Sequence, residues 1–169
     1  MAELLLELRS EEIPARMQAR AVADLAQLLG DGLSAAGLPA SATATYVTPR
    51  RLVVQLTGLA SRQPDQCIER RGPRVDAPEA AKAGFFKSLG PVTHVLEERE
   101  EKKGKVLFAV VSQPGRPTAE VVATLVPEVL ARFPWPKSMR WGGSEVRWVR
   151  PLQSILCLFS SQHEDPEVV

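Results

Sequence analysis

The sequence predicts an α+β fold, with mixed or antiparallel sheets and helices packed against them. Segments with the period-2 alternation of strands and segments with the spacing of amphipathic helices both occur, without the regular strand–helix alternation of a parallel sheet. The 169 residues are 44% hydrophobic, which is enough to build the core of one domain or of two small ones. We expect a β-α-β-β unit over residues 1–60, an Arg-rich connecting arm over 61–75 and a second α+β unit over 76–169.

The elements of the first unit follow from the spacing of its apolar residues. Alternating leucines over residues 4–8 predict a strand with one apolar face. The segment 10–14 predicts the start of a helix, with acids in the first turn where the helix dipole favours them, and Gly37 predicts its end. Residues 43–48 and 52–59 predict two strands of a hairpin, joined by a short basic turn.

Beyond the first unit, the polar arm is interrupted by Gly72-Pro73 and carries no periodic pattern. The expected elements after it are a helix from residue 76 to a stop at Gly90, strands over 92–96 and 105–111 joined by a charged tip at 97–104, a helix over 117–133 and a strand over 152–159. Pro127 is expected to kink or split its helix. Residues 162–169 predict a turn and the start of another strand, and we expect the unit to be truncated there because no returning strand follows.

Positive charge is concentrated in two segments, although the formal net charge of the chain is only +1. Six arginines face two acids between residues 50 and 74, and five bases face one acid between residues 132 and 151. Arginine supplies 15 of the 21 basic residues, and its planar guanidinium suits bidentate contacts with phosphates. A basic face is therefore expected on a chain that is not basic overall.

All three tryptophans lie in the second basic segment, between residues 133 and 152. Tryptophan stacks on flat groups and arginine binds phosphates, so their interleaving suits RNA as a partner. The alternative is that the tryptophans belong to the core and the arginines to a solvated rim. Because an apolar strand follows directly, we expect Trp141 and Trp148 to be core residues that position Lys137 and Arg140 on the outside.

The residues offer no recognisable catalytic or metal-binding set. Two histidines and two cysteines, at 94, 163, 67 and 157, do not have the spacing of a zinc site, and no Gly-rich phosphate loop occurs. The cysteines do not indicate a disulfide framework, and neither a signal peptide nor an apolar run of about 20 residues is present. We expect a cytoplasmic protein that does not enter a membrane, with no catalytic residue, metal ligand or bound cofactor in this chain.

Five blocks of the sequence, in order along almost the whole chain, resemble those of the bacterial glycyl-tRNA synthetase beta subunit. They are LELRSEEIP at 6–14, TPRRL at 48–52, RRGPRV at 70–75, PKSMRWG at 136–142 and VRWVRP at 146–151. The family chain is several times longer and continues into a middle domain that resembles HD hydrolases and an anticodon-binding region. The resemblance therefore identifies this chain as an N-terminal fragment of such a subunit.

The resemblance implies an α2β2 enzyme that attaches glycine to tRNA(Gly) with ATP and Mg²⁺. Glycine activation would occur on the alpha subunit, while the beta subunit binds and orients the tRNA. The isolated fragment would then be inactive and would bind neither ATP nor Mg²⁺ itself. A docking or scaffold role towards the alpha subunit or the remaining beta domains stays open, because Trp and Arg also anchor protein interfaces. So does a freestanding RNA-binding protein, which needs only a basic face.

The basic residues of these blocks are the candidates for contacts with tRNA phosphates, which orient a nucleic acid without reading its bases. They are Arg50, Arg51, Arg70, Arg71, Arg74, Lys137, Arg140, Arg147 and Arg150. Each arginine has an alternative structural role, in which it ties a loop to a carbonyl or carboxylate. Arg147 and Arg150 flank Trp148 and would brace it, whereas Arg50, Arg51 and Lys137 are the ones expected to be exposed.

Overall fold

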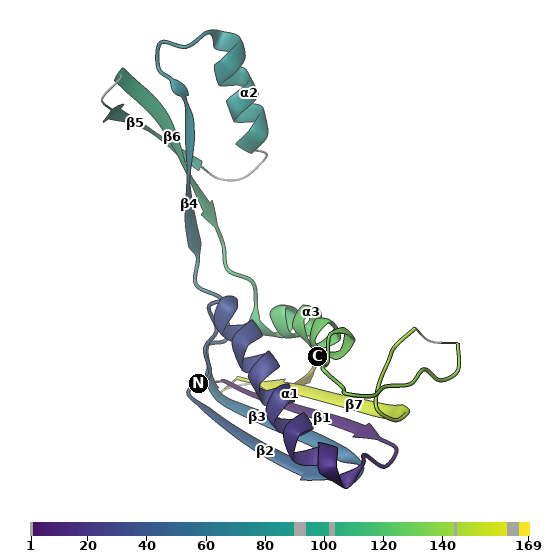
Figure 1. Ribbon diagram of the computed structural model, residues 1–169. Coiled ribbons are helices and arrows are strands. Elements are labelled where there is room, and N and C mark those ends of the chain that lie inside the picture. The colour runs from purple at the N-terminus through teal and green to yellow at the C-terminus, as the bar shows by residue number, and fades with distance from the viewer. Residues whose placement is uncertain (1, 90–93, 102–103, 144, 162–165) are drawn as a thin grey trace. The chain divides into compact units, whose positions relative to one another are not determined.

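The computed structural model describes residues 2–89, 94–101, 104–143, 145–161 and 166–169. In these ranges the chain forms two antiparallel sheets and three helices, which confirms the α+β class (Figure 1). Contacts group the chain into unit 1, residues 1–63 with 116–169, and unit 2, residues 64–115. Each unit is described by itself.

Unit 1 is built on a five-stranded sheet with the order β2-β3-β1-β7-β8. Its strands are β1 (Ala2–Ser10), β2 (Ala42–Thr48), β3 (Arg51–Leu59), β7 (Leu152–Ser160) and β8 (Glu167–Val168). The hairpin of β2 and β3 and the strand β7 confirm the sequence prediction, and β1-α1-β2-β3 is the predicted β-α-β-β order. The central strand β1 pairs with β3 on one side and with β7 on the other. Residues 116–169 therefore join the first unit, which differs from the expected boundaries at residues 60 and 75.

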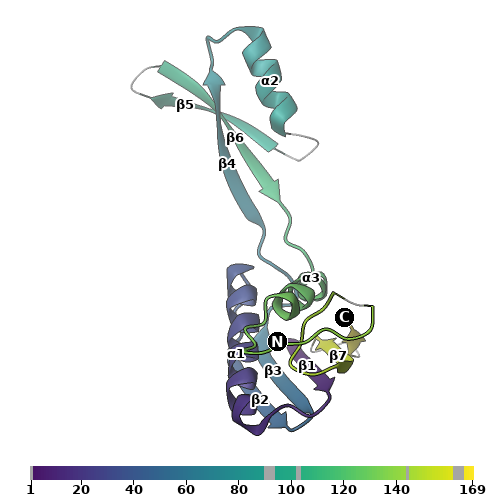
Figure 2. The same cartoon turned by 45° about the vertical axis from the view of Figure 1, so that its right-hand side comes forward.

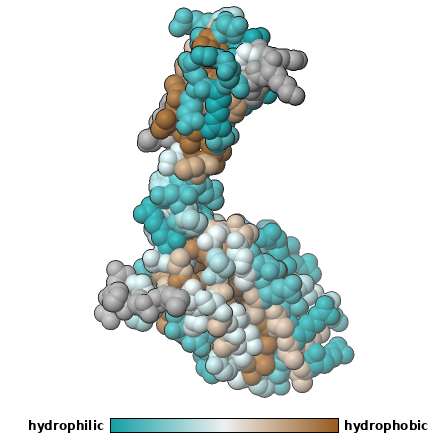
Figure 3. Space-filling model, turned by 90° about the vertical axis from the view of Figure 1, so that its left-hand side faces the viewer, coloured by the Kyte–Doolittle hydropathy of each residue, from teal (hydrophilic) through white to brown (hydrophobic). Residues whose placement is uncertain are grey.

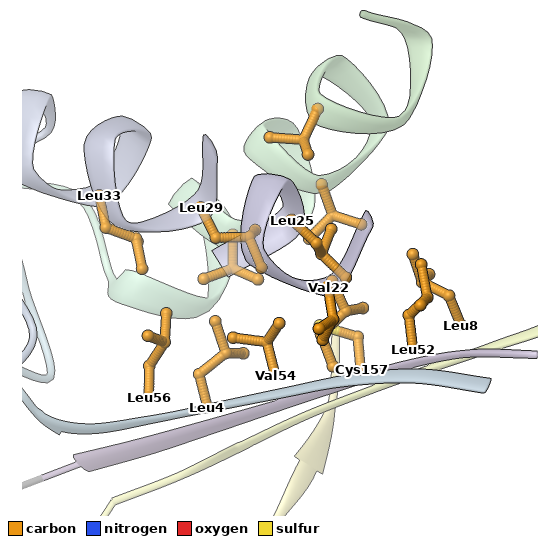
Figure 4. Packing of buried hydrophobic residues seen from close by; sticks show 14 of the residues in the cluster. Leu4, Leu8, Val22, Leu25, Leu29, Leu33, Leu52, Val54, Leu56 and Cys157 are labelled. Carbon is orange, nitrogen blue, oxygen red and sulfur yellow. The ribbon is translucent and has the colours of Figure 1, made fainter. Parts of the chain in front are cut away.

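Helices α1 (Ala15–Ala35) and α3 (Thr118–Ala131) pack over one face of this sheet (Figures 1 and 2). The alternating side chains of β1 and β3 point from the sheet towards α1 (Figure 4). The buried residues at this interface are Leu4, Leu6, Leu8, Leu52, Val54 and Leu56 from the strands and Leu25, Leu29 and Leu33 from α1. Each fully buried leucine contributes about 1.5–3 kcal/mol relative to an exposed one, so this layer is the main source of stability in unit 1.

The start of α1 differs from the prediction, which placed it at residues 10–14 with acids in the first turn. The helix begins at Ala15, its first turn contains no acid, and no side chain caps it. Strand β1 continues to Ser10, and the buried side chain of Ile13 fixes the connecting segment. The predicted end is confirmed, because Gly37 follows the helix with a φ of 77°, a conformation that glycine adopts without strain.

Helix α3 remains one helix through Pro127, so the expected split does not occur. Proline removes one backbone hydrogen bond and crowds the preceding turn. The valines on either side of it, Val126 and Val129, are both buried against the core of unit 1. Burial of this apolar face holds the two halves of α3 in a single element.

Unit 2 consists of β4 (Gln66–Arg74), α2 (Glu79–Leu89), β5 (His94–Glu101) and β6 (Gly104–Gln113), with the strand order β4-β6-β5. Phe85 and Leu89 of α2 pack on Ala109 and Val111 of the central strand. The predicted connecting arm at 61–75 is therefore mostly strand β4, and the predicted tip at 97–104 is mostly strand β5. Polar, charged residues hide the alternation of these strands in the sequence, and pairing with β6 satisfies their backbone groups. The expected stop at Gly90 and the first residues of the expected strand at 92–96 lie outside the described residues.

Candidate nucleic-acid interface

Arg50 and Arg51 lie at the turn between β2 and β3, and their side chains are 52% and 49% exposed. Each makes an ion pair with an acid from β1 or from the segment that follows it. Arg50 Nη2 lies 2.7 Å from Glu11 Oε2, and Arg51 Nε lies 3.4 Å from Glu7 Oε1. Exposed pairs of this kind contribute about 0–1 kcal/mol, so a phosphate can replace the carboxylate at little cost.

The segment between β1 and α1 lies between two basic loops and is hydrogen-bonded to both. The backbone N–H of Ser10 donates to the carbonyl of Arg50 at 2.9 Å, and that of Ile13 donates to Pro49 at 2.7 Å. The N–H of Glu11 donates to the carbonyl of Pro151 at 2.9 Å. These bonds bring the β2–β3 turn and the loop around Arg150 to the same end of unit 1, where α1 begins.

An aromatic cluster anchors the loop that follows α3. The ring centroids of Phe133, Trp135 and Trp148 are 4.7–5.0 Å apart, and Trp148 is completely buried. Trp135 and Trp141 are partly buried against the same core. The prediction that Trp148 is a core residue is confirmed, and Trp141 packs against the core as expected. The tryptophans therefore pack between the core and the basic loop.

The cations of this loop remain on the surface. Lys137, Arg140, Arg147 and Arg150 are all exposed. Arg147 Nε donates to Ser138 Oγ at 3.3 Å, and Arg150 Nη1 donates to the carbonyl of Val149 at 3.1 Å. Within the described ranges, no hydrogen bond or ion pair engages Lys137 or Arg140. The structure thus confirms that Lys137 and Arg140 lie on the surface.

A recess of about 250 Å³ lies between this loop and the first turn of α1. Its lining includes Lys137 and Arg150, which the sequence predicted as site residues, and Arg16, which it did not. Arg16 was missed because the helix was expected to start at residues 10–14, which would place Arg16 well inside the helix. The signal that could have found it is a basic residue two positions after Pro14, where proline favours the first helical turn.

The other three predicted site residues, Arg70, Arg71 and Arg74, belong to β4 of unit 2. Arg70 Nη1 donates to the carbonyl of Ser88 at 3.3 Å, and Arg74 Nε lies 3.4 Å from Asp76 Oδ1. Arg70 therefore ties β4 to the end of α2, which is the structural role left open for it. Arg71 is exposed on the same strand.

Unit 2 also carries a charge network that the sequence did not predict. Arg99 Nη2 lies 2.7 Å from Glu69 Oε1 and 2.8 Å from Glu97 Oε2. Its guanidinium lies 5.0 Å from the ring centroid of Phe108, within the range of a cation–π contact. The hydrogen bonds from Arg99, and secondarily its charge, hold the pKa of Glu69 below its ordinary value of 4.5. The two carboxylates in turn raise the pKa of Arg99.

Over the described ranges, no three His, Cys, Asp or Glu side chains gather in a way that could hold a metal ion. None of the helices in the part of the chain that the structure describes combines the length and the apolar character needed to cross a membrane.

Comparisons with known proteins match the chain to one family. The family model described as "Glycyl-tRNA synthetase beta subunit" matches residues 4–168. The chain is 55% identical over 162 residues to a glycine–tRNA ligase beta subunit of Paracoccus denitrificans, covering 96% of this chain and 24% of the relative. The glycine–tRNA ligase beta subunit of Cereibacter sphaeroides is 56% identical, and the match covers 96% of this chain and 23% of the relative. That of a Ruegeria species is 52% identical, and the match covers 100% of this chain and 24% of the relative.

The comparisons place this α+β chain, with its basic loops, among the subunits of aminoacyl-tRNA synthetases. It belongs to the glycyl-tRNA synthetase beta subunit family, as the five sequence blocks predicted. The chain spans about a quarter of the length of the curated relatives that it matches.

Proposed function

We propose that this chain is part of the beta subunit of a glycine–tRNA ligase, and that unit 1 binds and orients tRNA(Gly) for ATP-dependent glycylation. Family membership over residues 4–168 is the observation that carries the proposal. The exposed cations at the α1 end of unit 1 support it, because Arg and Lys contacts with phosphates fix the register of a nucleic acid. Glycine activation, with ATP and Mg²⁺, belongs to the alpha subunit of a cytoplasmic α2β2 assembly.

Binding of tRNA(Gly) to the chain at several salt concentrations tests this role. The slope of log K against log salt is about −0.7 to −0.9 per neutralised phosphate. Replacing Arg50 and Arg51 by Gln is expected to flatten the slope by about one to two units and to weaken binding. Arg132→Gln is the matched control, because Arg132 is an exposed arginine of unit 1 that pairs with Glu128 at the end of α3. If the chain does not bind tRNA(Gly), or if the double variant binds with unchanged slope, the role given to the β2–β3 turn is refuted.

Glycylation assays test how the proposed activity is divided between subunits. The chain alone is expected to charge no tRNA, and the chain mixed with the alpha subunit is expected to charge little or none. Robust charging by that mixture would contradict the proposal that the remaining length of the beta subunit is needed.

The second candidate function is docking of the alpha subunit, and the open face of the unit 1 sheet favours it. This face lies opposite α1 and α3 and carries Tyr46, which is 58% exposed, and Leu156, which is 41% exposed. Unit 2 also presents apolar surface, part of which is brown in Figure 3. Its exposed apolar side chains include Ile68, Val95 and Leu96. Capture of the alpha subunit by the immobilised chain, lost on Tyr46→Ser with Leu156→Ser, together with absent tRNA binding, would favour docking over tRNA orientation.

A further inference from the structure

The recess at the N-terminal end of α1 collects three cationic side chains from distant parts of unit 1. Arg16 comes from α1, and Lys137 and Arg150 come from the two sides of the loop that contains Trp148. The other residues that line it are Pro14, Met17, Ser138, Met139 and Val149. None of these described lining residues is an acid. The recess is therefore a concave surface of a single sign of charge.

The positions of the two loop cations are set by the fold. Met139 and Trp148 exchange two backbone hydrogen bonds, which pair the residues after Lys137 with those before Arg150. Trp148 is fully buried, so this pairing is anchored in the core. Because the loop backbone is already fixed, ligand binding has to order the cationic side chains but not the loop itself.

No acid from the described part of unit 1 compensates the charge of the recess. Arg16 and Lys137 make no ion pair or hydrogen bond with any side chain in the described part of the chain, and Arg150 donates only to the carbonyl of Val149. The two acids that precede Arg16 along the chain, Glu11 and Glu12, do not line the recess. Glu11 is engaged by Arg50 and by the side-chain amide of Gln153. The first turn of α1 contains no acid and no side-chain cap, so the positive end of the helix adds to the same field.

We propose that this recess binds one phosphate group. Phosphate carries the charge to neutralise clustered cations and has several acceptor oxygens, which match the fork of an arginine and the point charge of a lysine. The volume of about 250 Å³ is many times the ~10–15 Å³ that a single water needs, so the group has room to enter. The source is either a backbone phosphate of RNA, which rests on the proposed function, or free inorganic phosphate.

One phosphate shared by three cations has a signature that separate surface contacts lack. If each cation met its own phosphate, replacing all three by Gln would flatten the salt slope of tRNA(Gly) binding by about two to three units. If they share one phosphate, the salt slope of the triple variant is flatter by only about 0.7–0.9 units in total. In that case Arg16→Gln alone is expected to lose most of the tRNA affinity that the triple variant loses. The triple variant and the single variant are compared with Arg132→Gln, which removes one positive charge elsewhere in unit 1.

The second arm uses inorganic phosphate alone, at constant ionic strength set with chloride. Phosphate is expected to raise the unfolding temperature of the chain and of Arg132→Gln, and to leave those of Arg16→Gln and the triple variant unchanged. All three substituted side chains are exposed, and circular dichroism of each variant verifies its fold.

The two arms separate the failure of this inference from the failure of the proposed function. One outcome is that phosphate stabilises the chain only when the three residues are present, while the unaltered chain does not bind tRNA. This outcome supports the recess as a phosphate site and overturns RNA as the source of the phosphate. Binding of tRNA with the same slope and affinity in the triple variant, and no phosphate effect that depends on these residues, overturns the recess and leaves the proposed function standing. A loss of two to three slope units overturns the sharing of one phosphate.

Discussion

Met139 and Trp148 pair their backbones, with N–H···O distances of 2.8 and 3.2 Å, across the loop that separates α3 from β7. Trp148 lies completely in the core, in contact with the rings of Phe133 and Trp135, whereas Met139 is exposed. Because Trp148 is fixed in the core, this pairing holds in place the backbone of the loop that carries Lys137 and Arg150.

Trp148→Ala is expected to lower the free energy of unfolding of unit 1 by about 3–5 kcal/mol, because it leaves a large cavity beside two aromatic rings. Trp148→Phe keeps a ring and removes an indole N–H that has no acceptor in the described part of the chain, so its loss is expected to be smaller. Urea unfolding followed by circular dichroism measures both. Trp141→Ala, at a partly buried position, is the control, and a loss there equal to that of Trp148→Ala would contradict the anchoring role of Trp148.

Gly30 and Gly32 lie two positions apart in α1 but have different surroundings. A Cβ on Gly30 would meet nothing within 4 Å, whereas a Cβ on Gly32 would press on the side chain of Leu125 in α3. Gly30→Ala is expected to stabilise unit 1 by about 0.5–1 kcal/mol, because alanine is the better helix former. Gly32→Ala is expected to gain nothing or to destabilise through overpacking. Thermal unfolding of the two variants measures the difference, and equal stabilisation of both would show that α1 and α3 do not approach closely at Gly32.

The two cysteines are expected to react with thiol reagents at very different rates. Cys67 is exposed, whereas burial raises the pKa of the Cys157 thiol to about 11. At pH 8 a disulfide reagent should therefore modify one thiol of the folded chain rapidly and the second only after unfolding. Cys67→Ser identifies the fast thiol, and rapid labelling of that variant would contradict the burial of Cys157.

The same thiol makes stability fall at high pH. The folded state holds the Cys157 proton more tightly than the unfolded chain, in which the pKa is near 9.0. Stability is thus fully retained below pH 9 and is lost as the pH rises towards 11. Cys157→Ala should remove this part of the pH dependence.

The Arg99–Glu69 pair in unit 2 is expected to appear in an acid titration. Because the folded-state pKa of Glu69 lies below 4.5, the pair contributes stability above that value and loses it as the pH falls through the lowered pKa. Arg99→Gln should return the Glu69 pKa towards 4.5, as measured by carboxyl chemical shifts. A wild-type midpoint at or above 4.5 would refute the pairing. High salt should reduce the difference, because both groups are exposed.

The sequence predicted those elements whose apolar spacing is visible. Leu4, Leu6 and Leu8 indicated β1, and the apolar run at 152–159 indicated β7. Five short blocks were enough to predict the family. The strands β4 and β5 were missed because their residues are mostly charged, and only pairing with β6 makes them strands.

For the candidate site, the sequence by itself determined the identity of the cations, Lys137 and Arg150 among them, and the core role of Trp148. Only the tertiary structure decided which cations meet. It joined Arg16 to Lys137 and Arg150 and placed Arg70 in a different unit, next to Ser88. The reason is that β1 pairs with β7 across some 150 residues of sequence, a contact made by backbone hydrogen bonds that no local pattern encodes.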